Sequence, residues 1–285
     1  FPILVRFSAE EWMPGHRTLE ESLKIAKTLE EAGVAALDIS AGTFEASEAV
    51  MDTMHFKEGW NTYAATAIKE VVNIPVITSH TLRTPAYCES IIAENKADLV
   101  GLSRQLIADP YWAAKAKAGC DEDIRKCISC LVGCWKESLM IKREMRCAIN
   151  PAMGDERFLD MKKASKSMKV AIVGGGIAGM EAARIATIRG HQCTIFEKDN
   201  ELGGILRSCC CVPPKSKMKW YMDWLRRQIS LLGVDVRLRT EATIDMLKEY
   251  DVVLCGTGSD TVIPDVPGKE KGIRFNDVLI CQAVK

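Results

Sequence analysis

Residues 169–179 read KVAIVGGGIAG, a short apolar run that passes directly into a glycine-rich turn. The run Lys169-Val-Ala-Ile-Val173 is typical of a buried strand, and the G-x-G-x-x-G turn after it opens a predicted helix. The first glycine permits a tight turn, the second allows the backbone to approach a pyrophosphate, and the third allows close packing of helix on strand. The N–H groups and dipole of the helix N-terminus would hold the phosphates. We therefore expect a dinucleotide site formed by Gly174, Gly176, Ile177, Ala178 and Gly179.

The residues after the glycine turn complete the pattern of a dinucleotide-binding unit. Gly190 ends the predicted helix, and Gln192 to Glu197 form a second strand that finishes on a carboxylate. A carboxylate in this place accepts hydrogen bonds from ribose hydroxyls and repels a 2′-phosphate. This context favours a dinucleotide site over a chance glycine turn. Two later segments, Leu202-Gly203-Gly204 and Cys255-Gly-Thr257-Gly258, resemble the flavin-disulfide-reductase type of FAD site and favour FAD over NAD here.

Four of the twelve cysteines have the spacing of metal ligands. The pattern is Cys127-x2-Cys130-x3-Cys134-x12-Cys147, with three close thiols and one remote thiol. Three closely spaced thiols can bind one face of an iron–sulfur cube, and a distant fourth thiol completes the ligand set. This spacing resembles [4Fe–4S] ligation. A structural zinc ion is the main alternative, although zinc ligands usually come as two separated short-spaced pairs, and unligated thiols are another. The other cysteines, including 209–211, are expected as small buried apolar residues.

Residues 1 to about 118 alternate short apolar runs with helical stretches, the pattern of parallel strand–helix units. The expected strands are Ile3–Phe7, Val34–Ile39, Ile74–Thr78 and Ala97–Leu102. Helix starts are marked by the capping box Thr18-Leu-Glu-Glu21 and by the proline in Thr84-Pro85 and in Asp109-Pro110. Four such units are half of a (β/α)8 barrel, and a doubly wound sheet is the alternative. The first strand is compact and β-branched, so we expect it to be buried.

Polar residues in and after these strands are candidates for binding a phosphate or another electron-rich group. Gly101, Ser103 and Arg104 lie at the carboxyl end of the fourth strand, where barrel enzymes bind phosphate. Gly101 allows close backbone approach, and Arg104 offers its planar guanidinium to a phosphate. The alternative is that Arg104 is a surface arginine that binds no ligand. Arg6 lies inside an apolar run, and a buried charge is costly unless paired, so we expect it to face an electron-rich ligand.

The composition argues against several classes of protein. The 285 residues are 47% apolar and 27% charged, and 38 Lys and Arg balance 38 Asp and Glu. Without a net charge or an apolar run of about 18 residues, neither nucleic-acid binding nor membrane insertion is expected. Cysteines in a long chain of this kind indicate a reducing, cytoplasmic location rather than a disulfide scaffold. The chain begins without Met at Phe1-Pro2, so we expect further residues before it.

The expected fold class is α/β, with four segments along the chain. Residues 1–118 form the C-terminal half of a TIM (β/α)8 barrel, and residues 119–150 hold the spaced cysteines. Residues 151–167 are a solvated linker, and residues 168–285 form a truncated Rossmann-like domain that binds FAD or NAD(P).

Together these features resemble the bacterial flavoenzymes typified by 2,4-dienoyl-CoA reductase, 2-enoate reductase and trimethylamine dehydrogenase. The resemblance covers essentially the whole sequence. It is strongest at Val5–Ser8, Thr18–Gly33, Asp98–Pro110, the four spaced cysteines and Gly174–Gly179. It implies an old-yellow-enzyme-type barrel that binds FMN, a [4Fe–4S] cluster, and later domains that bind FAD and NADH, with NADPH less favoured. Trimethylamine dehydrogenase carries ADP in place of FAD.

Carried over by position, the resemblance assigns roles to individual residues. Arg6 matches the arginine that faces the N1/O2 side of the isoalloxazine and stabilises the anionic reduced flavin. Ser103 and Arg104 match the FMN phosphate site. Cys127, Cys130, Cys134 and Cys147 match the cluster ligands. The FAD site would include Glu197, Gly203, Gly204, Thr257 and Gly258.

Two departures from the family pattern concern the flavin site. Reductases of this kind often carry a His or Tyr near the end of the second strand as a proton donor. This chain has Gly42-Thr43-Phe44 there, and a phenyl ring cannot donate a proton. The family also tends to place Gly or Asn before a basic residue after the next strand, where Ser79-His80-Thr81 stands here. His80 or Arg83 would have to compensate, and no catalytic residue is assigned.

The resemblance implies a relay in which NADH reduces FAD, electrons cross the cluster, and FMN reduces a carbon–carbon double bond conjugated to a carbonyl. The small-molecule substrate would be an enoate, an enoyl-CoA or an enone. An amine dehydrogenase that passes electrons to a protein acceptor is a second hypothesis, and a non-catalytic nucleotide-binding protein with a zinc site is a third. No feature of the sequence decides the oligomeric state, and a homo-oligomer stays open.

Overall fold

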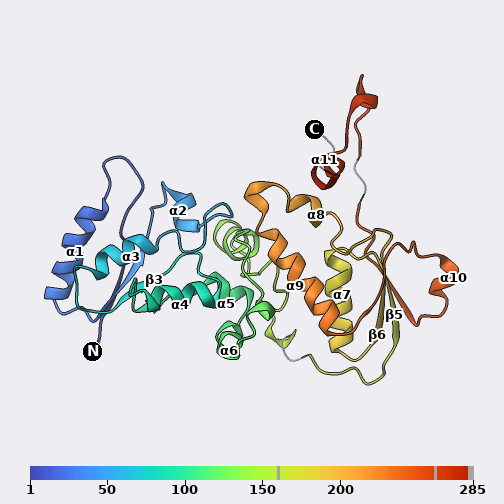
Figure 1. The fold of residues 1–285 in the computed structure, drawn as a ribbon, viewed down its shortest axis with the longest axis horizontal. Helices are drawn as coiled ribbons and strands as arrows, with labels where there is room; N and C mark the ends of the chain where they lie inside the picture. Colours follow the sequence, from blue (N-terminus) through green and yellow to red (C-terminus); the bar gives the residue numbers. More distant parts are fainter. Residues whose placement is uncertain (159–160, 260–261, 282–285) are drawn as a thin grey trace. The chain divides into compact units, whose positions relative to one another are not determined.

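The computed structural model describes residues 1–158, 161–259 and 262–281, and Figure 1 draws its fold as a ribbon. The chain divides into two compact units, Phe1–Gly154 and Asp155–Lys285. The boundary falls inside the segment expected as a linker, so the segment that holds the spaced cysteines belongs to the first unit. Within the described ranges, no helix is both long enough and apolar enough to cross a membrane.

The first unit is built on a parallel sheet of four strands in the order β1-β2-β3-β4. The strands are β1 Leu4–Ser8, β2 Ala36–Ser40, β3 Val76–Thr78 and β4 Leu99–Val100. Each strand pairs with the next along the chain, and Arg6 is the register partner of Asp38. Sequential order is that of a barrel, whereas a doubly wound sheet reverses its order at a switch point. All four carboxyl ends therefore lie at one edge of the sheet.

Helices connect these strands, and their starts follow the expected capping signals. They are α1 Leu19–Glu31, α2 Ser47–Met51, α3 Thr62–Lys69, α4 Pro85–Ala93, α5 Arg104–Ala108 and α6 Trp112–Lys117. The capping box of α1 is confirmed: the Glu21 N–H donates to Thr18 Oγ1, and the Thr18 N–H donates to the Glu21 carboxylate at 2.8 Å. Pro85 is the first residue of α4, where its missing N–H costs no helix hydrogen bond.

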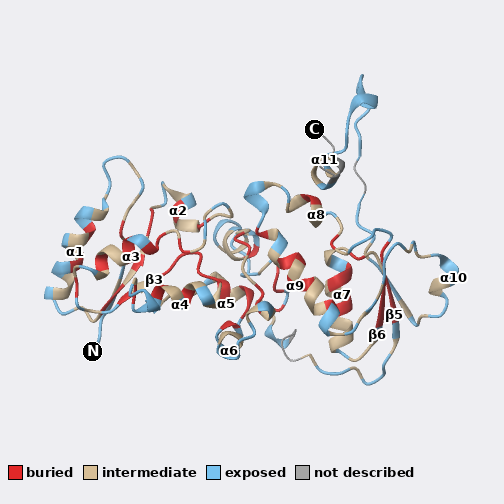
Figure 2. Cartoon of the chain, viewed as in Figure 1, coloured by how far each residue is buried: buried red, intermediate tan, exposed pale blue. Residues whose placement is uncertain are grey.

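The core of the first unit lies between the sheet and helices α1 and α3. Leu37 and Ile39 of β2 and Val76 of β3 are fully buried and pack with alanines of both helices. The first strand, expected to be buried, lies at the edge of the sheet in this chain, and its Leu4 is 58% exposed. In Figure 2 the buried residues follow the interior strands and the helix faces turned toward them.

The second unit contains a separate parallel sheet in the order β7-β6-β5-β8. Its strands are β5 Lys169–Val173, β6 Gln192–Phe196, β7 Asp235–Arg237 and β8 Val252–Cys255. Its helices are α7 Ile177–Ile188, α8 Leu206–Cys209, α9 Met218–Leu231, α10 Ile244–Leu247 and α11 Phe275–Cys281. Helices α7 and α9 pack side by side (Figure 1), and Met180, Ala183 and Leu225 on them are fully buried.

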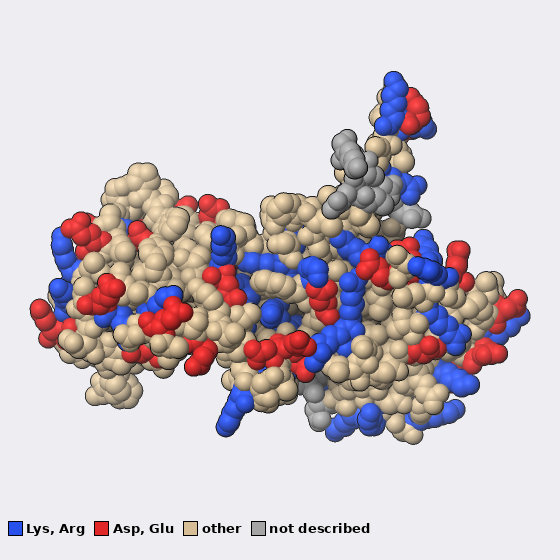
Figure 3. Space-filling model, viewed as in Figure 1, with Lys and Arg blue, Asp and Glu red and all other residues tan. Residues whose placement is uncertain are grey.

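Charges of both signs are interspersed over the face that Figure 3 draws. This mixture reflects the equal numbers of basic and acidic residues, 38 of each, in the sequence.

Ile39→Ala should lower the free energy of unfolding by about 2–5 kcal/mol, because it leaves a cavity in the centre of the sheet. Ile92 in α4 is 40% exposed and serves as the matched control. Ile92→Ala should change the unfolding free energy by less than about 0.5 kcal/mol. Urea unfolding followed by circular dichroism measures both variants, and equal losses would contradict the core assignment.

Candidate functional site

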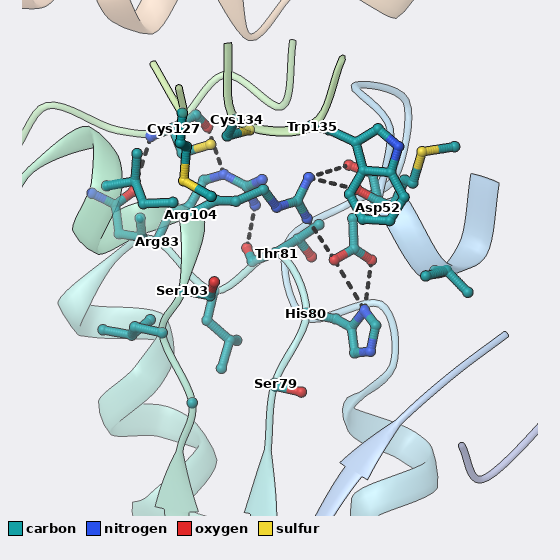
Figure 4. Close-up of a pocket in the computed structure, with 18 of the residues that line it drawn as sticks. Asp52, Ser79, His80, Thr81, Arg83, Ser103, Arg104, Cys127, Cys134 and Trp135 are labelled. Atoms are coloured by element: carbon teal, nitrogen blue, oxygen red, sulfur yellow. Dashed lines mark hydrogen bonds and ion pairs between the residues drawn. The ribbon is translucent and has the colours of Figure 1, made fainter. Parts of the chain in front are cut away.

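A pocket of about 500 Å³ opens at the carboxyl ends of the four strands in the first unit, and Figure 4 shows it in close-up. Its walls come from β1 and β2, from the segments that follow β3 and β4, from α2 and α5, and from the cysteine-rich segment. This edge is where sheets of parallel strands bind their ligands. The lining includes Arg6, Asp38, Asp52, Ser79, His80, Gly101, Ser103, Arg104, Cys127 and Cys134.

Arg6 reaches the pocket from β1 and already has a counter-charge within the chain. Its Nη1 lies 2.5 Å from Asp38 Oδ2, and its Nη2 donates to Ser40 Oγ at 3.3 Å. The Arg6 side chain is 52% exposed, so the expectation of a buried charge is wrong: register pairing brings it beside Asp38. The second oxygen, Asp38 Oδ1, is buried and meets no donor among the described residues. Asp38 Oδ1 can therefore accept a hydrogen bond from a ligand bound in the pocket.

Asp52 is the centre of the pocket's polar contacts, and the sequence analysis did not single it out. Its Oδ1 lies 2.9 Å from His80 Nδ1 and accepts from the indole N–H of Trp60, and its Oδ2 lies 2.7 Å from Arg104 Nη2. Asp52 is 3% exposed, so its charge depends on these partners. His80 and Arg104 lie 28 and 52 residues further along the chain, so no local spacing could have revealed these two contacts of Asp52.

His80 and Thr81 adopt left-handed backbone conformations, with φ of 76° and 50°. Glycine takes this conformation readily, whereas a β-branched residue such as threonine is strained there. Side-chain contacts hold both residues: His80 is bound to Asp52, and Thr81 Oγ1 donates to the Lys57 carbonyl at 2.8 Å and accepts from the Gly59 N–H at 3.1 Å. The segment that departs from the family pattern is thus kept in a glycine-like conformation by its own side chains.

The residues expected at a phosphate site lie at the end of β4 and differ in what they contact. A Cβ on Gly101 would lie 3.2 Å from the Ser79 Cβ, so this glycine allows two strand ends to pack closely. Ser103 is exposed and is the N-cap of α5. The guanidinium of Arg104 is bound to Asp52 rather than free. A phosphate group at this place would share Arg104 with that carboxylate.

The fold brings the four spaced cysteines toward one another. A Cβ on Gly133 would lie 2.9 Å from the Cys147 backbone nitrogen, so the missing side chain allows very close packing. This contact sets the π-helix Val132–Met140, which carries Cys134, against the segment of Cys147. Cys127 and Cys134 also line one pocket.

The residue type at these four positions, rather than their protonation, fits a metal-binding role. Burial is the main cause that raises the pKa of Cys130, Cys134 and Cys147, so without a metal they are neutral thiols at pH 7. In the described part of the chain, no group of three or more Cys, His, Asp or Glu side chains has metal-site geometry as it stands. Four neighbouring thiols nevertheless match the donor set that iron–sulfur clusters and zinc use, and binding would release their protons.

Two buried side chains of the barrel hold the backbone of Cys127. Arg83 Nε donates to the Cys127 carbonyl at 2.6 Å, and the Cys127 N–H donates to Gln105 Oε1 at 2.9 Å. Both side chains belong to residues that are 2% exposed. Arg83 was a candidate to replace the family's basic residue near the flavin phosphate, but its guanidinium is turned to the cysteine-rich segment. The sequence did not identify Gln105 as a site residue, because a glutamine after a strand is not typical of any particular site.

In the second unit the glycine turn has the geometry that the sequence predicts. Gly174 has φ of 104°, and a Cβ on it would lie 2.3 Å from the Gly256 carbonyl oxygen. A Cβ on Gly179 would lie 1.9 Å from the Gly174 carbonyl oxygen, so α7 packs directly on the turn. Gly176, the N-cap of α7, has no atom within 4 Å of the place of an added Cβ. This open space at a helix N-terminus fits a pyrophosphate.

The remaining candidate residues of the second unit surround this turn. Glu197 is 6% exposed and accepts the Gly175 N–H at 2.7 Å, and the Gly203 N–H donates to the Gly175 carbonyl at 2.9 Å. The Thr257 nitrogen would lie 3.2 Å from a Cβ on Gly174. The residues gathered at the turn from later segments are Glu197, Gly203, Gly204 and Thr257, and Ile177 and Ala178 open the helix. Gly258, the remaining candidate, has φ of 74° and no atom within 4 Å of the place of an added Cβ.

These features define an α/β protein in which part of a barrel, with a pocket at its carboxyl edge, precedes a nucleotide-binding unit. The family model for the NADH:flavin oxidoreductase / NADH oxidase family matches residues 1–123, and the chain belongs to this family. A model of an NAD(P)-binding Rossmann-like domain matches residues 172–215. The expected fold, half of a TIM barrel followed by a Rossmann-like domain, is confirmed.

Individual proteins agree with this assignment. An NADH oxidase from Thermoanaerobacter brockii is 46% identical over 278 residues, which are 96% of this chain and 43% of that protein. The structure of a 2-naphthoyl-CoA reductase complex matches with a TM-score of 0.93 and 30% identity, covering 100% of this chain and 44% of that one. The 6-hydroxypseudooxynicotine amine oxidase of Pseudomonas geniculata N1 matches with a TM-score of 0.81 and 27% identity, covering 90% and 39%. This chain therefore spans less than half the length of these proteins.

Gly176→Ala should leave the fold intact and weaken dinucleotide binding at least about tenfold, because the methyl group fills the open space before α7. Gly179→Ala should lower stability by about 1–3 kcal/mol, because its methyl group meets the Gly174 carbonyl. Thermal unfolding and calorimetric titration with FAD measure the two effects. Unchanged FAD affinity in the Gly176 variant would contradict a pyrophosphate site at this turn.

Proposed function

We propose that this chain is part of an iron–sulfur flavoprotein oxidoreductase that uses NADH to reduce a carbon–carbon double bond conjugated to a carbonyl group. The substrate class comprises enoates, enoyl-CoA thioesters and enones. FMN would bind in the pocket of the first unit and a [4Fe–4S] cluster at the four spaced cysteines. FAD would bind at the glycine turn of the second unit.

One observation carries the proposal: Cys127 and Cys134 line the same pocket as Arg6 and Arg104. A flavin in this pocket and a cluster on these thiols would be direct neighbours. When bound, the flavins supply hydride chemistry and the cluster supplies single-electron transfer. The shared wall supports a role for the cysteines in electron transfer, because a purely structural metal has no need to border a ligand pocket.

The residues of the pocket have distinct roles in this proposal. Arg6 places positive charge where electron density grows on a reduced flavin, and Asp38 fixes the direction of its guanidinium. Arg104 and Ser103 would hold the phosphate group. Asp52 keeps the Arg104 guanidinium at the pocket when no phosphate is present.

An amine dehydrogenase is the second candidate, and one residue favours it. Phe44 follows β2, is 84% exposed, and cannot donate the proton that alkene reduction requires. Oxidation of an amine needs no such donor, and the amine oxidase compared above shares the fold. A zinc protein without flavin is the third candidate, because zinc accepts the same four thiols.

Protein purified without oxygen should contain iron and sulfide and show flavin bands with a broad shoulder at about 400 nm. Cys130→Ala should abolish the shoulder, because it removes one ligand. Cys120→Ala should leave it unchanged, because Cys120 is an exposed thiol outside the ligand set. Zinc in place of iron, or a shoulder that persists after Cys130→Ala, would refute the cluster assignment.

The holoenzyme should oxidise NADH under anaerobic conditions only when an enoate or enone is supplied, and more slowly with NADPH. Arg6→Met should lower kcat at least about 100-fold, because it removes the positive charge that stabilises the reduced flavin. Anaerobic turnover of NADH, with product analysis, measures both. Bleaching of the flavin by an amine in the absence of NADH would instead support the dehydrogenase alternative.

A further inference from the structure

Arg83 is a buried cation where the barrel meets the cysteine-rich segment. It lies in the loop between β3 and α4 and is 2% exposed. Its guanidinium donates to three oxygens: the Cys127 carbonyl at 2.6 Å, the Ser129 hydroxyl and the Thr81 carbonyl. All three are neutral, so none of them supplies the negative charge that a buried guanidinium requires.

The acidic side chains near Arg83 are engaged by other groups. Asp52 is bound to Arg104. The Glu58 carboxylate accepts the backbone N–H groups of Arg83 and Thr84. The Arg83 guanidinium instead binds the Cys127 carbonyl and the Ser129 hydroxyl, so its positive charge lies beside Cys127, a predicted cluster ligand.

Arg83 is itself held in a fixed position. Trp112 Nε1 donates to the Arg83 carbonyl at 2.6 Å, and the Arg83 N–H donates to Glu58 Oε1 at 2.6 Å. Gln105 Oε1 accepts the Cys127 N–H, so Cys127 is bound at both its N–H and its C=O by side chains of the barrel. Figure 4 shows Arg83 directed at Cys127 beside the pocket.

We propose that Arg83 is a positioning residue that fixes Cys127 as a cluster ligand and, by its positive charge, raises the reduction potential of the cluster. This inference rests on the proposed function. One-electron reduction adds a negative charge to the cluster, so a nearby buried cation stabilises the reduced form more than the oxidised form. Net charge and hydrogen bonds around a cluster are what set its potential.

Two substitutions separate the charge of Arg83 from its hydrogen bonds. Arg83→Met removes both, so the reduction potential of the holoenzyme's cluster should shift to lower values. Arg83→Lys keeps the charge but not the planar fork, so the potential should stay near that of the wild type while the iron content falls. Potentiometric titration followed by electron paramagnetic resonance gives the potential, and iron and sulfide analysis gives the cluster content.

A matched control is Lys69→Met. Lys69 Nζ lies 2.5 Å from Asp98 Oδ1 at the amino ends of β3 and β4, the opposite edge of the sheet from the pocket. Its side chain is 15% exposed, and its loss should leave the cluster potential unchanged.

The outcomes distinguish this inference from the proposed function. An unchanged potential in a cluster-loaded Arg83→Met protein would overturn the inference about Arg83 alone. If Arg83→Met does not fold, Arg83→Lys provides the test, because it keeps the positive charge. A lowered cluster potential in Arg83→Lys would then overturn the inference about Arg83. Wild-type protein without iron and sulfide would overturn the cluster and this inference together.

Discussion

The parallel direction of strands β1 to β4 is the constraint on which the pocket depends, because it sets four carboxyl ends at one edge. Residues far apart in sequence then become neighbours through the strand register. Arg6 and Asp38 are partners on adjacent strands, so their ion pair follows from the sheet itself. The loops that leave these strand ends supply the other polar groups. The second unit obeys the same rule, with its glycine turn directly after the central strand β5.

Two arginines of the pocket have an acidic partner within the chain. Asp38 compensates Arg6, and Asp52 compensates Arg104 while also binding His80. Asp52 is buried, so removing it would leave Arg104 uncompensated, which costs more than the intact pair contributes. The pocket therefore offers an anionic cofactor fixed hydrogen-bond donors rather than a large positive field. Binding a phosphate there requires the Arg104 contacts to be shared or rearranged.

Local signals in the sequence predicted much of the fold. The capping box of α1, the bounds of β5 and the glycine turn depend on residues within one turn or strand, and each has the predicted form. The cysteine spacing likewise singled out Cys127 and Cys134, which line one pocket. Helix α9 was overlooked although its buried residues repeat at helical spacing. They are Tyr221, Trp224, Leu225 and Ile229.

Features that depend on tertiary contacts were out of reach. Asp52 and Gln105 acquire their roles only from partners that other strands bring near. Arg83 was considered from its neighbours in sequence, yet its guanidinium is bound to a segment 44 residues further on.

The attachment of Cys127 to the barrel has a consequence for protein engineering. Its N–H and C=O are bound by Gln105 and Arg83, neither of which belongs to the cysteine-rich segment. Transplanting residues 119–150 into an unrelated scaffold would carry every thiol but leave both anchors behind. The cysteine-rich segment is thus not portable on its own, and a graft has to include the strand ends that support it.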